Sequence, residues 1–250
     1  MNPLTKALDG VGACVLLFFQ TVRYLPTLPR QWKSLLDQCL FMGYATLPLV
    51  VILSFFIGGV LALQFAYATV DIGLKEFIGT IVGLSMVLEL APVMTAVMVS
   101  GRIGSAVTAE LASMKVYSEV DALRTMNISP ERFLVLPRVV ALMLVMPMLT
   151  IFSMVTGWVG GQVVSQMVDW IDLAPTAYYQ SLTSAMTLSD IGKGLLKGQL
   201  FAIGIILISC VTGLRASGGP REIGAAVTKA VVVCIIYILV SDYFITHALF

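Results

Sequence analysis

The chain has 250 residues, of which 58% are hydrophobic and only 12% charged, and its mean hydropathy is +0.96. A water-soluble domain of this size has no core large enough to bury that much apolar surface, so the composition excludes an ordinary soluble protein. The formal net charge of +1, without any run of Lys and Arg, also excludes a strongly basic nucleic-acid-binding protein.

The N-terminal segment Leu4–Leu36 alternates apolar clusters with cations and is too charged to cross a membrane. Tyr24 and Trp32 are of the residue types that anchor chains at membrane surfaces. We therefore predict that residues 1–36 form an amphipathic, interfacial elbow helix ahead of a transmembrane core at residues 37–250, all within one domain. A mobile tail is the alternative.

Five later segments are long and apolar enough to cross the hydrocarbon core, which requires about 20 residues in a tilted helix. They predict an all-α integral membrane protein with these spans: Phe41–Ala66, Phe77–Val99, Val139–Val168, Gly198–Leu214 and Ala225–Phe244. The fourth is short, and we expect it to extend back past Lys197, whose ammonium group snorkels to the membrane surface. Ala174–Leu188 is too polar and too short to span and is expected to form an interfacial helix or loop.

The distribution of cations predicts the orientation of the chain. One side of the membrane receives most of them: Lys6, Arg23, Arg30, Lys33, Lys115, Arg124, Arg132, Arg138, Arg215 and Arg221. The other side receives Lys75, Lys193 and Lys197 together with Asp71, Glu76, Asp169, Asp172 and Asp190. We therefore expect a cytoplasmic N-terminus and a C-terminus outside.

Glu89 is the most informative single residue, because a carboxylate in the middle of an apolar span costs several kcal/mol unless it faces a cavity, is paired or is protonated. Pro92 follows it and removes a helix hydrogen bond, which can kink the span. These residues predict a cavity-facing or gating position. A carboxylate that only packs between helices is the alternative.

Between the second and third spans, Glu110–Arg132 is rich in charge and in helix-forming residues. Glu119, Asp121 and Arg124 alternate with apolar residues, which predicts a short amphipathic cytoplasmic helix. Such a helix either docks into a soluble partner or is an ordinary solvated segment.

Motifs of several enzyme classes are missing from the sequence. It contains no phosphate-binding P-loop, no H-E-x-x-H and no G-x-S-x-G, and its one histidine is His247. The four cysteines are scattered singly, so neither a metal site nor a redox motif is expected. Small residues recur at four-residue spacing and predict close helix packing: Gly79/Gly83, Gly101/Ser105, Gly157/Gly161 and Gly194/Gly198.

Several short motifs together closely resemble the MlaE-type (YrbE-like) permeases. They run from Glu89-Leu90-Ala91-Pro92 through Gly101-Arg102-Ile103-Gly104, Ala109-Glu110-Leu111, Met114-Lys115-Val116, Asp121-Ala122-Leu123 and Pro137-Arg138 to Gly224–Val232. The resemblance covers roughly Pro48 to the end of the chain. Gly101, Arg102, Gly104, Pro137 and Arg138 are therefore candidate motif residues.

The resemblance implies a homodimeric permease subunit, not itself an enzyme, of an ABC transporter that moves phospholipids between the inner and outer membranes of a bacterium. A separate ATPase subunit would hold the ATP and Mg²⁺, and this chain would bind no cofactor. Further implied partners are a periplasmic MCE-domain lipid-binding protein and a STAS-domain protein. The coupling helix would be Glu110–Asn127, with these candidate contacts to the ATPase: Glu110, Lys115, Glu119, Asp121 and Arg124.

The resemblance also places Glu89, with Leu88 and Pro92, at a lipid cavity or gate. Many members of the family have Arg before this Glu, whereas Leu88 occupies that position here. Glu89 therefore needs a partner from elsewhere or is protonated. Two other functions stay open: a self-sufficient secondary carrier or channel, which usually shows several intramembrane charges, and an intramembrane lipid-modifying enzyme, which needs a nucleophile with a base or a metal.

Overall fold

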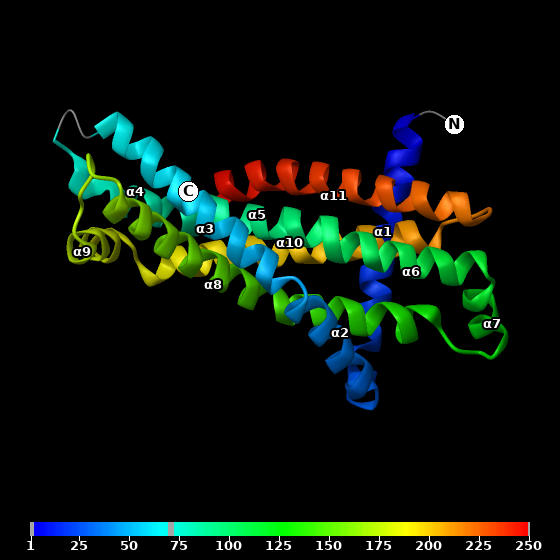
Figure 1. The fold of residues 1–250 in the computed structure, drawn as a ribbon. Helices are drawn as coiled ribbons and strands as arrows, with labels where there is room; N and C mark the ends of the chain where they lie inside the picture. The colour runs from blue at the N-terminus through cyan, green and yellow to red at the C-terminus, as the bar shows by residue number, and fades with distance from the viewer. Residues whose placement is uncertain (1–2, 70–72, 250) are drawn as a thin grey trace. The chain divides into compact units, whose positions relative to one another are not determined.

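The computed structural model describes residues 3–69 and 73–249, and the side chains of residues 9–69 and 73–249. Figure 1 shows a chain of helices, and no β-strand occurs in the described ranges. The α-helices are α1 (Pro3–Tyr24), α2 (Trp32–Tyr44), α3 (Leu47–Thr69), α4 (Ile78–Ser85), α5 (Ala91–Val99), α6 (Ser105–Val116), α7 (Glu119–Thr125), α8 (Leu136–Met167), α9 (Pro175–Ala185), α10 (Leu188–Leu214) and α11 (Pro220–Leu249). Short 3₁₀ helices occupy Leu25–Gln31 and Lys75–Phe77.

Five stretches of the described chain are long and apolar enough to cross a membrane: Asp9–Thr69, Lys75–Val116, Glu131–Met167, Leu188–Leu214 and Pro220–Leu249. Each overlaps one of the predicted spans, and the third ends at Met167, one residue before the predicted Val168. The prediction of an all-α, multi-pass membrane protein is therefore confirmed. The fourth span begins at Leu188, ten residues before the predicted Gly198, and Lys197 lies inside the helix.

The predicted elbow at residues 1–36 corresponds to α1, the following 3₁₀ helix and the start of α2. Its position at a membrane surface stays a prediction, and residues 1–2 and the expected outer-side Asp71 lie outside the described residues. Of the two alternatives predicted for Ala174–Leu188, a helix or a loop, the structure has the helix α9. It packs along α4, and Tyr178 at their contact is fully buried.

Two compact units make up the described chain, and each gathers three separate stretches of sequence. Unit 1 comprises residues 1–45, 99–145 and 200–244, and unit 2 comprises residues 46–98, 146–199 and 245–250. Within unit 2, α3 and α8 touch backbone to backbone, because Gly58, Gly157 and Gly160 carry no side chain to separate them. Ser54 and Ser153 share a hydrogen bond of 2.7 Å across the same contact.

The predicted small-residue pairs differ in whether they bring two helices into close contact. In unit 2, Gly79 and Gly83 lie against α9, as close packing requires. Gly101, in contrast, has open space where a side chain would stand, and the Ser105 hydroxyl donates back to the Gly101 carbonyl. The Gly101/Ser105 pair therefore does not pack two helices within this chain.

Three π-helical segments widen the helices, at Met86–Leu90, Ser100–Gly104 and Glu131–Val135. The first and third are each followed by one residue and then a proline, Pro92 or Pro137. Proline has no N–H and its ring clashes with the carbonyl four residues earlier, so a slip to the wider π ladder relieves the clash. The kink predicted at Pro92 is thus accommodated by a π segment that contains Glu89.

Candidate functional site

The Glu89 carboxylate in unit 2 is paired with Lys197 on α10. The Lys197 ammonium donates to Glu89 Oε2 at 2.5 Å, and the Lys197 side chain is only 2% exposed. Thr246, near the end of α11, accepts from the same ammonium at 2.7 Å and donates to Glu89 Oε1 at 3.0 Å. These three residues form the polar cluster, as we call it.

Local backbone geometry explains why Lys197 reaches this place. Pro92 has no N–H to offer the carbonyl of Leu88, four residues earlier. The Lys197 ammonium donates to that Leu88 carbonyl at 3.3 Å. One turn before Lys197, Gly194 lies so close to the Val87 carbonyl that a side chain there would collide with it. A proline, a glycine and a lysine therefore act together at one contact.

The polar cluster contradicts the predicted snorkelling of Lys197 and identifies the partner of Glu89. Snorkelling of Lys197 to the membrane surface is wrong, because its ammonium donates inside unit 2 to the Leu88 carbonyl, the Glu89 carboxylate and the Thr246 hydroxyl. The partner of Glu89 that Leu88 could not supply is Lys197, with Thr246 beside it. Glu89 itself is 39% exposed, so one side of its carboxylate lies on the surface of unit 2.

A second ion pair holds unit 1 together. Arg138, whose side chain is 5% exposed, donates from Nη2 to Glu110 Oε1 at 2.6 Å and from Nη1 to the Leu134 carbonyl at 2.5 Å. Leu134 belongs to the π segment Glu131–Val135. Arg138 therefore joins α6 to the start of α8, and Glu110 serves this join.

The coupling helix predicted at about Glu110–Asn127 is divided between two helices in the structure, since α6 ends at Val116 and α7 begins at Glu119. Its role in coupling stays a prediction. Ser118 has the left-handed φ of 63°, which ends α6 and redirects the backbone. Lys115, near the end of α6, donates to both oxygens of Asp121 on α7, at 2.8 and 2.9 Å. This hydrogen bond holds the pKa of Asp121 below its usual value.

The predicted coupling residues therefore fall into two groups. Lys115, Asp121 and Arg124 lie together, and Arg124 is 4.0 Å from Asp121. Glu119 is exposed on the first turn of α7, whereas Glu110 is held by Arg138. Figure 1 shows α7 as a short helix on the connection between α6 and α8.

Among the motif residues, Gly104 packs against Ser209 and Ile205 of α10. Arg102 is half-buried in the π segment Ser100–Gly104, and Pro137 is buried beside Arg138. In the part of the chain that the structure describes, no three His, Cys, Asp or Glu side chains gather closely enough to hold a metal ion.

Comparison with known protein families identifies the family to which this chain belongs. The family model described as Permease MlaE matches residues 35–248, which include both ion pairs and α7. The chain belongs to the MlaE permease family.

Several curated proteins share this family's sequence pattern with the chain. A probable ABC transporter permease protein of Rickettsia typhi is 37% identical over 245 residues, which cover 98% of this chain and 94% of the relative. A probable ABC transporter permease protein of Synechocystis is 35% identical over 218 residues, covering 87% and 82%. The chloroplastic protein Trigalactosyldiacylglycerol 1 of Arabidopsis thaliana is 32% identical over 219 residues, covering 88% and 62%. The chain is thus an ABC transporter permease.

Sequence reasoning about this MlaE permease missed Lys197 and Thr246. A signal for Lys197 was present: an opposite charge in a second apolar span marks a candidate partner for Glu89. The expected snorkelling concealed it, because it placed the Lys197 ammonium at the membrane surface and not beside Glu89. Thr246 carried no signal, since one Thr near a chain end looks like any other.

Proposed function

We propose that this MlaE permease forms the membrane-spanning homodimer of an ABC transporter that moves phospholipids between the inner and outer membranes of a bacterium. The observation that carries the proposal is the polar cluster. It offers one carboxylate, one ammonium and one hydroxyl inside apolar spans, and the Glu89 carboxylate lies partly on the surface of unit 2.

Such a surface suits an amphipathic substrate. Acyl chains need only apolar surroundings, while a headgroup needs a few polar partners to fix its position. A phospholipid headgroup that carries a phosphate and an amine can exchange contacts with Lys197 and Glu89 in turn. The name of the Arabidopsis relative, which is that of a glycolipid, supports a lipid substrate.

The proposed complex contains a separate ABC ATPase subunit that binds ATP and Mg²⁺. α7, with its exposed Glu119, Asp121 and Arg124, would lie in a groove of that subunit. An MCE-domain lipid-binding protein and a STAS-domain protein complete the proposed assembly. The resemblance of the sequence to MlaE-type permeases suggests these partners.

The proposed orientation has the N-terminus in the cytoplasm and the C-terminus in the periplasm of the inner membrane. It is supported by the cation distribution, which becomes more asymmetric once Lys197 is removed from the outer side as a buried residue. Single cysteines introduced at residues 9–33 in a cysteine-free background should react with an impermeant reagent only in inside-out vesicles. Labelling in intact cells would show the opposite orientation.

The function is tested with the complex reconstituted in proteoliposomes that contain a fluorescent phospholipid. We expect ATP-dependent phospholipid movement with the parent chain and a large loss with Glu89→Gln, which keeps shape but removes the charge. Glu76→Gln is the matched control, because Glu76 is an exposed acid of the same unit outside the cluster. Full transport by Glu89→Leu in a normally assembled complex would remove the polar cluster from the mechanism.

A self-sufficient secondary carrier is the second candidate, and one observation favours it. Carriers place several charges within the membrane, and Lys197 and Arg138 are buried in addition to the half-exposed Glu89. Phospholipid movement by the purified chain without an ATPase subunit, driven by an ion gradient, would establish the carrier. We expect none.

A further inference from the structure

A hollow of about 490 Å³ opens in unit 1 where the 3₁₀ helix Leu25–Gln31 meets α2. Its lining consists of Pro29–Ser34 and Phe133. Trp32 and Phe133 are 60% and 52% exposed, although both are large aromatic side chains. The hollow shares no residue with the polar cluster or with the ion pairs Lys115–Asp121, Arg124–Asp121 and Arg138–Glu110 of unit 1.

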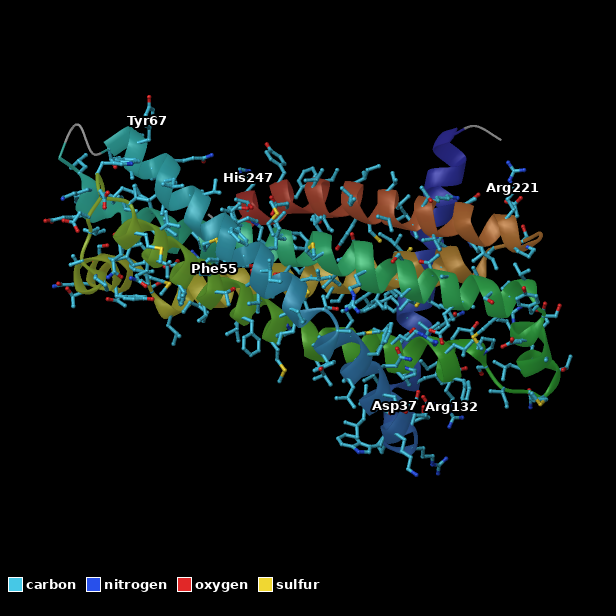
Figure 2. All side chains as sticks on the ribbon, viewed as in Figure 1. Asp37, Phe55, Tyr67, Arg132, Arg221 and His247 are labelled. Atoms are coloured by element: carbon cyan, nitrogen blue, oxygen red, sulfur yellow. The ribbon has the colours of Figure 1, made fainter. Side chains whose placement is uncertain are left out.

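Two cations line this hollow. Arg30 and Lys33 are both exposed, and neither takes part in an ion pair among the side chains of residues 9–69 and 73–249. No acidic residue is part of the lining. The flanking elements carry Asp37 on α2 and Glu131 and Arg132 beside Phe133, and Figure 2 labels Asp37 and Arg132 there. The lining therefore presents positive charge to whatever occupies the hollow.

An apolar row continues from the hollow along α2. Trp32, Leu36, Leu40 and Tyr44 follow one another at four-residue spacing, and they are 60%, 42%, 66% and 82% exposed. Residues four apart lie on one helix face, and this row is about 18 Å long at 1.5 Å per residue. The helix packs through other residues, Leu35 and Met42, which are buried. The row is thus left open to an apolar partner.

We propose that this hollow binds an anionic phospholipid of the surrounding bilayer. Arg30 and Lys33 hold the phosphate, Trp32 and Phe133 flank the glycerol region, and one acyl chain lies along the row on α2. Cations next to an exposed apolar row match the two halves of a phospholipid, whereas a free phosphate would use the cations alone. The proposal requires a membrane-spanning chain but does not depend on which substrate that chain transports.

Trp32 supplies the experiment, because bromine on a lipid acyl chain quenches a nearby indole. The complete chain is placed in nanodiscs that contain either brominated phosphatidylglycerol or brominated phosphatidylcholine at equal mole fraction. The difference between the parent chain and Trp32→Phe isolates the Trp32 emission from that of Trp158 and Trp170. We expect the anionic lipid to quench Trp32 at a roughly tenfold lower mole fraction, as two cations near a phosphate predict.

Variants of the cations give the decisive comparison. In Arg30→Gln/Lys33→Gln the preference for the anionic lipid should disappear, and each single variant should lose part of it. The control Arg221→Gln/Lys229→Gln removes two exposed cations of the same unit outside the hollow and should keep the preference (Arg221 is labelled in Figure 2).

Three results would overturn the proposal. They are equal quenching by the two brominated lipids, an unchanged preference in Arg30→Gln/Lys33→Gln, and loss of the preference when inorganic phosphate replaces chloride at constant ionic strength. The last result would assign the hollow to free phosphate. If the equal quenching of the first result is close to zero with both lipids, a lipid is rejected and the row is left to a protein partner.

Discussion

Each unit contains an ion pair that joins its helices. The two pairs share the same arrangement of partners but differ in the chemistry of the cation. Each pair joins a buried cation to a half-exposed carboxylate, Lys197 to Glu89 in unit 2 and Arg138 to Glu110 in unit 1. Each cation also donates to a carbonyl of a π segment, that of Leu88 or Leu134. In both units a backbone carbonyl of a π segment thus serves as an acceptor for the buried cation.

The difference lies in the cation. The Lys197 ammonium is a compact charge whose contacts include a carbonyl, a carboxylate and a hydroxyl. The Arg138 guanidinium is a rigid fork, and its two Nη atoms reach two different helical segments. A lysine can release one partner and keep another, whereas a fork fixes the distance between the groups it joins. We therefore assign exchangeable contacts to the polar cluster and a fixed join to Arg138.

The largest effect is expected from Glu89→Leu. It leaves the nearly inaccessible Lys197 ammonium without a counter-charge, and such a change costs about 3–5 kcal/mol of unfolding free energy. Thermal unfolding of the purified chain in detergent measures it. Lys197→Met should cost less, because the Glu89 carboxylate that it leaves behind is 39% exposed.

The double variant Glu89→Leu/Lys197→Met tests whether the two residues act as a pair. Removing both charges should recover most of the stability lost in Glu89→Leu, because contacting residues show non-additive effects. Transport should stay lost if the cluster handles the headgroup. Additive losses of stability would mean that the pairing contributes nothing.

The second effect is expected at Arg138. Arg138→Lys keeps the charge but cannot bridge Glu110 and the Leu134 carbonyl together, so we expect a loss of about 1–2 kcal/mol in unfolding free energy. The reverse substitution, Lys197→Arg, makes the same comparison in unit 2. A planar guanidinium should fit poorly among the oxygen acceptors that surround the Lys197 ammonium. An Arg138→Lys chain as stable as the parent would show that the fork is dispensable.

The third effect concerns α7 and the proposed ATPase subunit. Reversing both charges with Glu119→Lys/Asp121→Lys should weaken copurification of the ATPase about tenfold or more, because charge-assisted contacts are replaced by repulsion. Glu76→Lys, an exposed acid of unit 2, serves as the control. Undiminished copurification after the double reversal would reject α7 as the docking element.

The smallest effect is a pH dependence at Asp121. Its pKa is lowered by the Lys115 hydrogen bond, so the contribution of this pair is present above the ordinary Asp pKa and is lost only as the pH falls through the lowered value. We therefore expect the Lys115–Asp121 link, and any ATPase binding that depends on it, to be unchanged between about pH 8 and about pH 5. Binding measured across this range checks it, and a loss near neutral pH would point to another group.

The five spans could be predicted from the sequence because a helix that crosses a bilayer requires a long uninterrupted apolar segment, and such segments are local in sequence. Glu89 stood out for the same reason. The break between α6 and α7 was not readable, because Ser118 adopts a left-handed conformation that no glycine or asparagine announced. A charged, helix-forming segment therefore looked like one helix.

The amino-acid sequence by itself determined the class of this protein, its spans and the carboxylate of Glu89, because hydropathy and charge are properties of short segments. Only the tertiary structure decided which cation Glu89 meets, and that Glu110 pairs with Arg138. Lys197 is 108 residues from Glu89, and Thr246 is 157 residues away. Their meeting depends on Gly194 allowing one helix to approach another and on Pro92 leaving a carbonyl to be bound. These backbone contacts arise from tertiary packing, which a local sequence pattern does not predict.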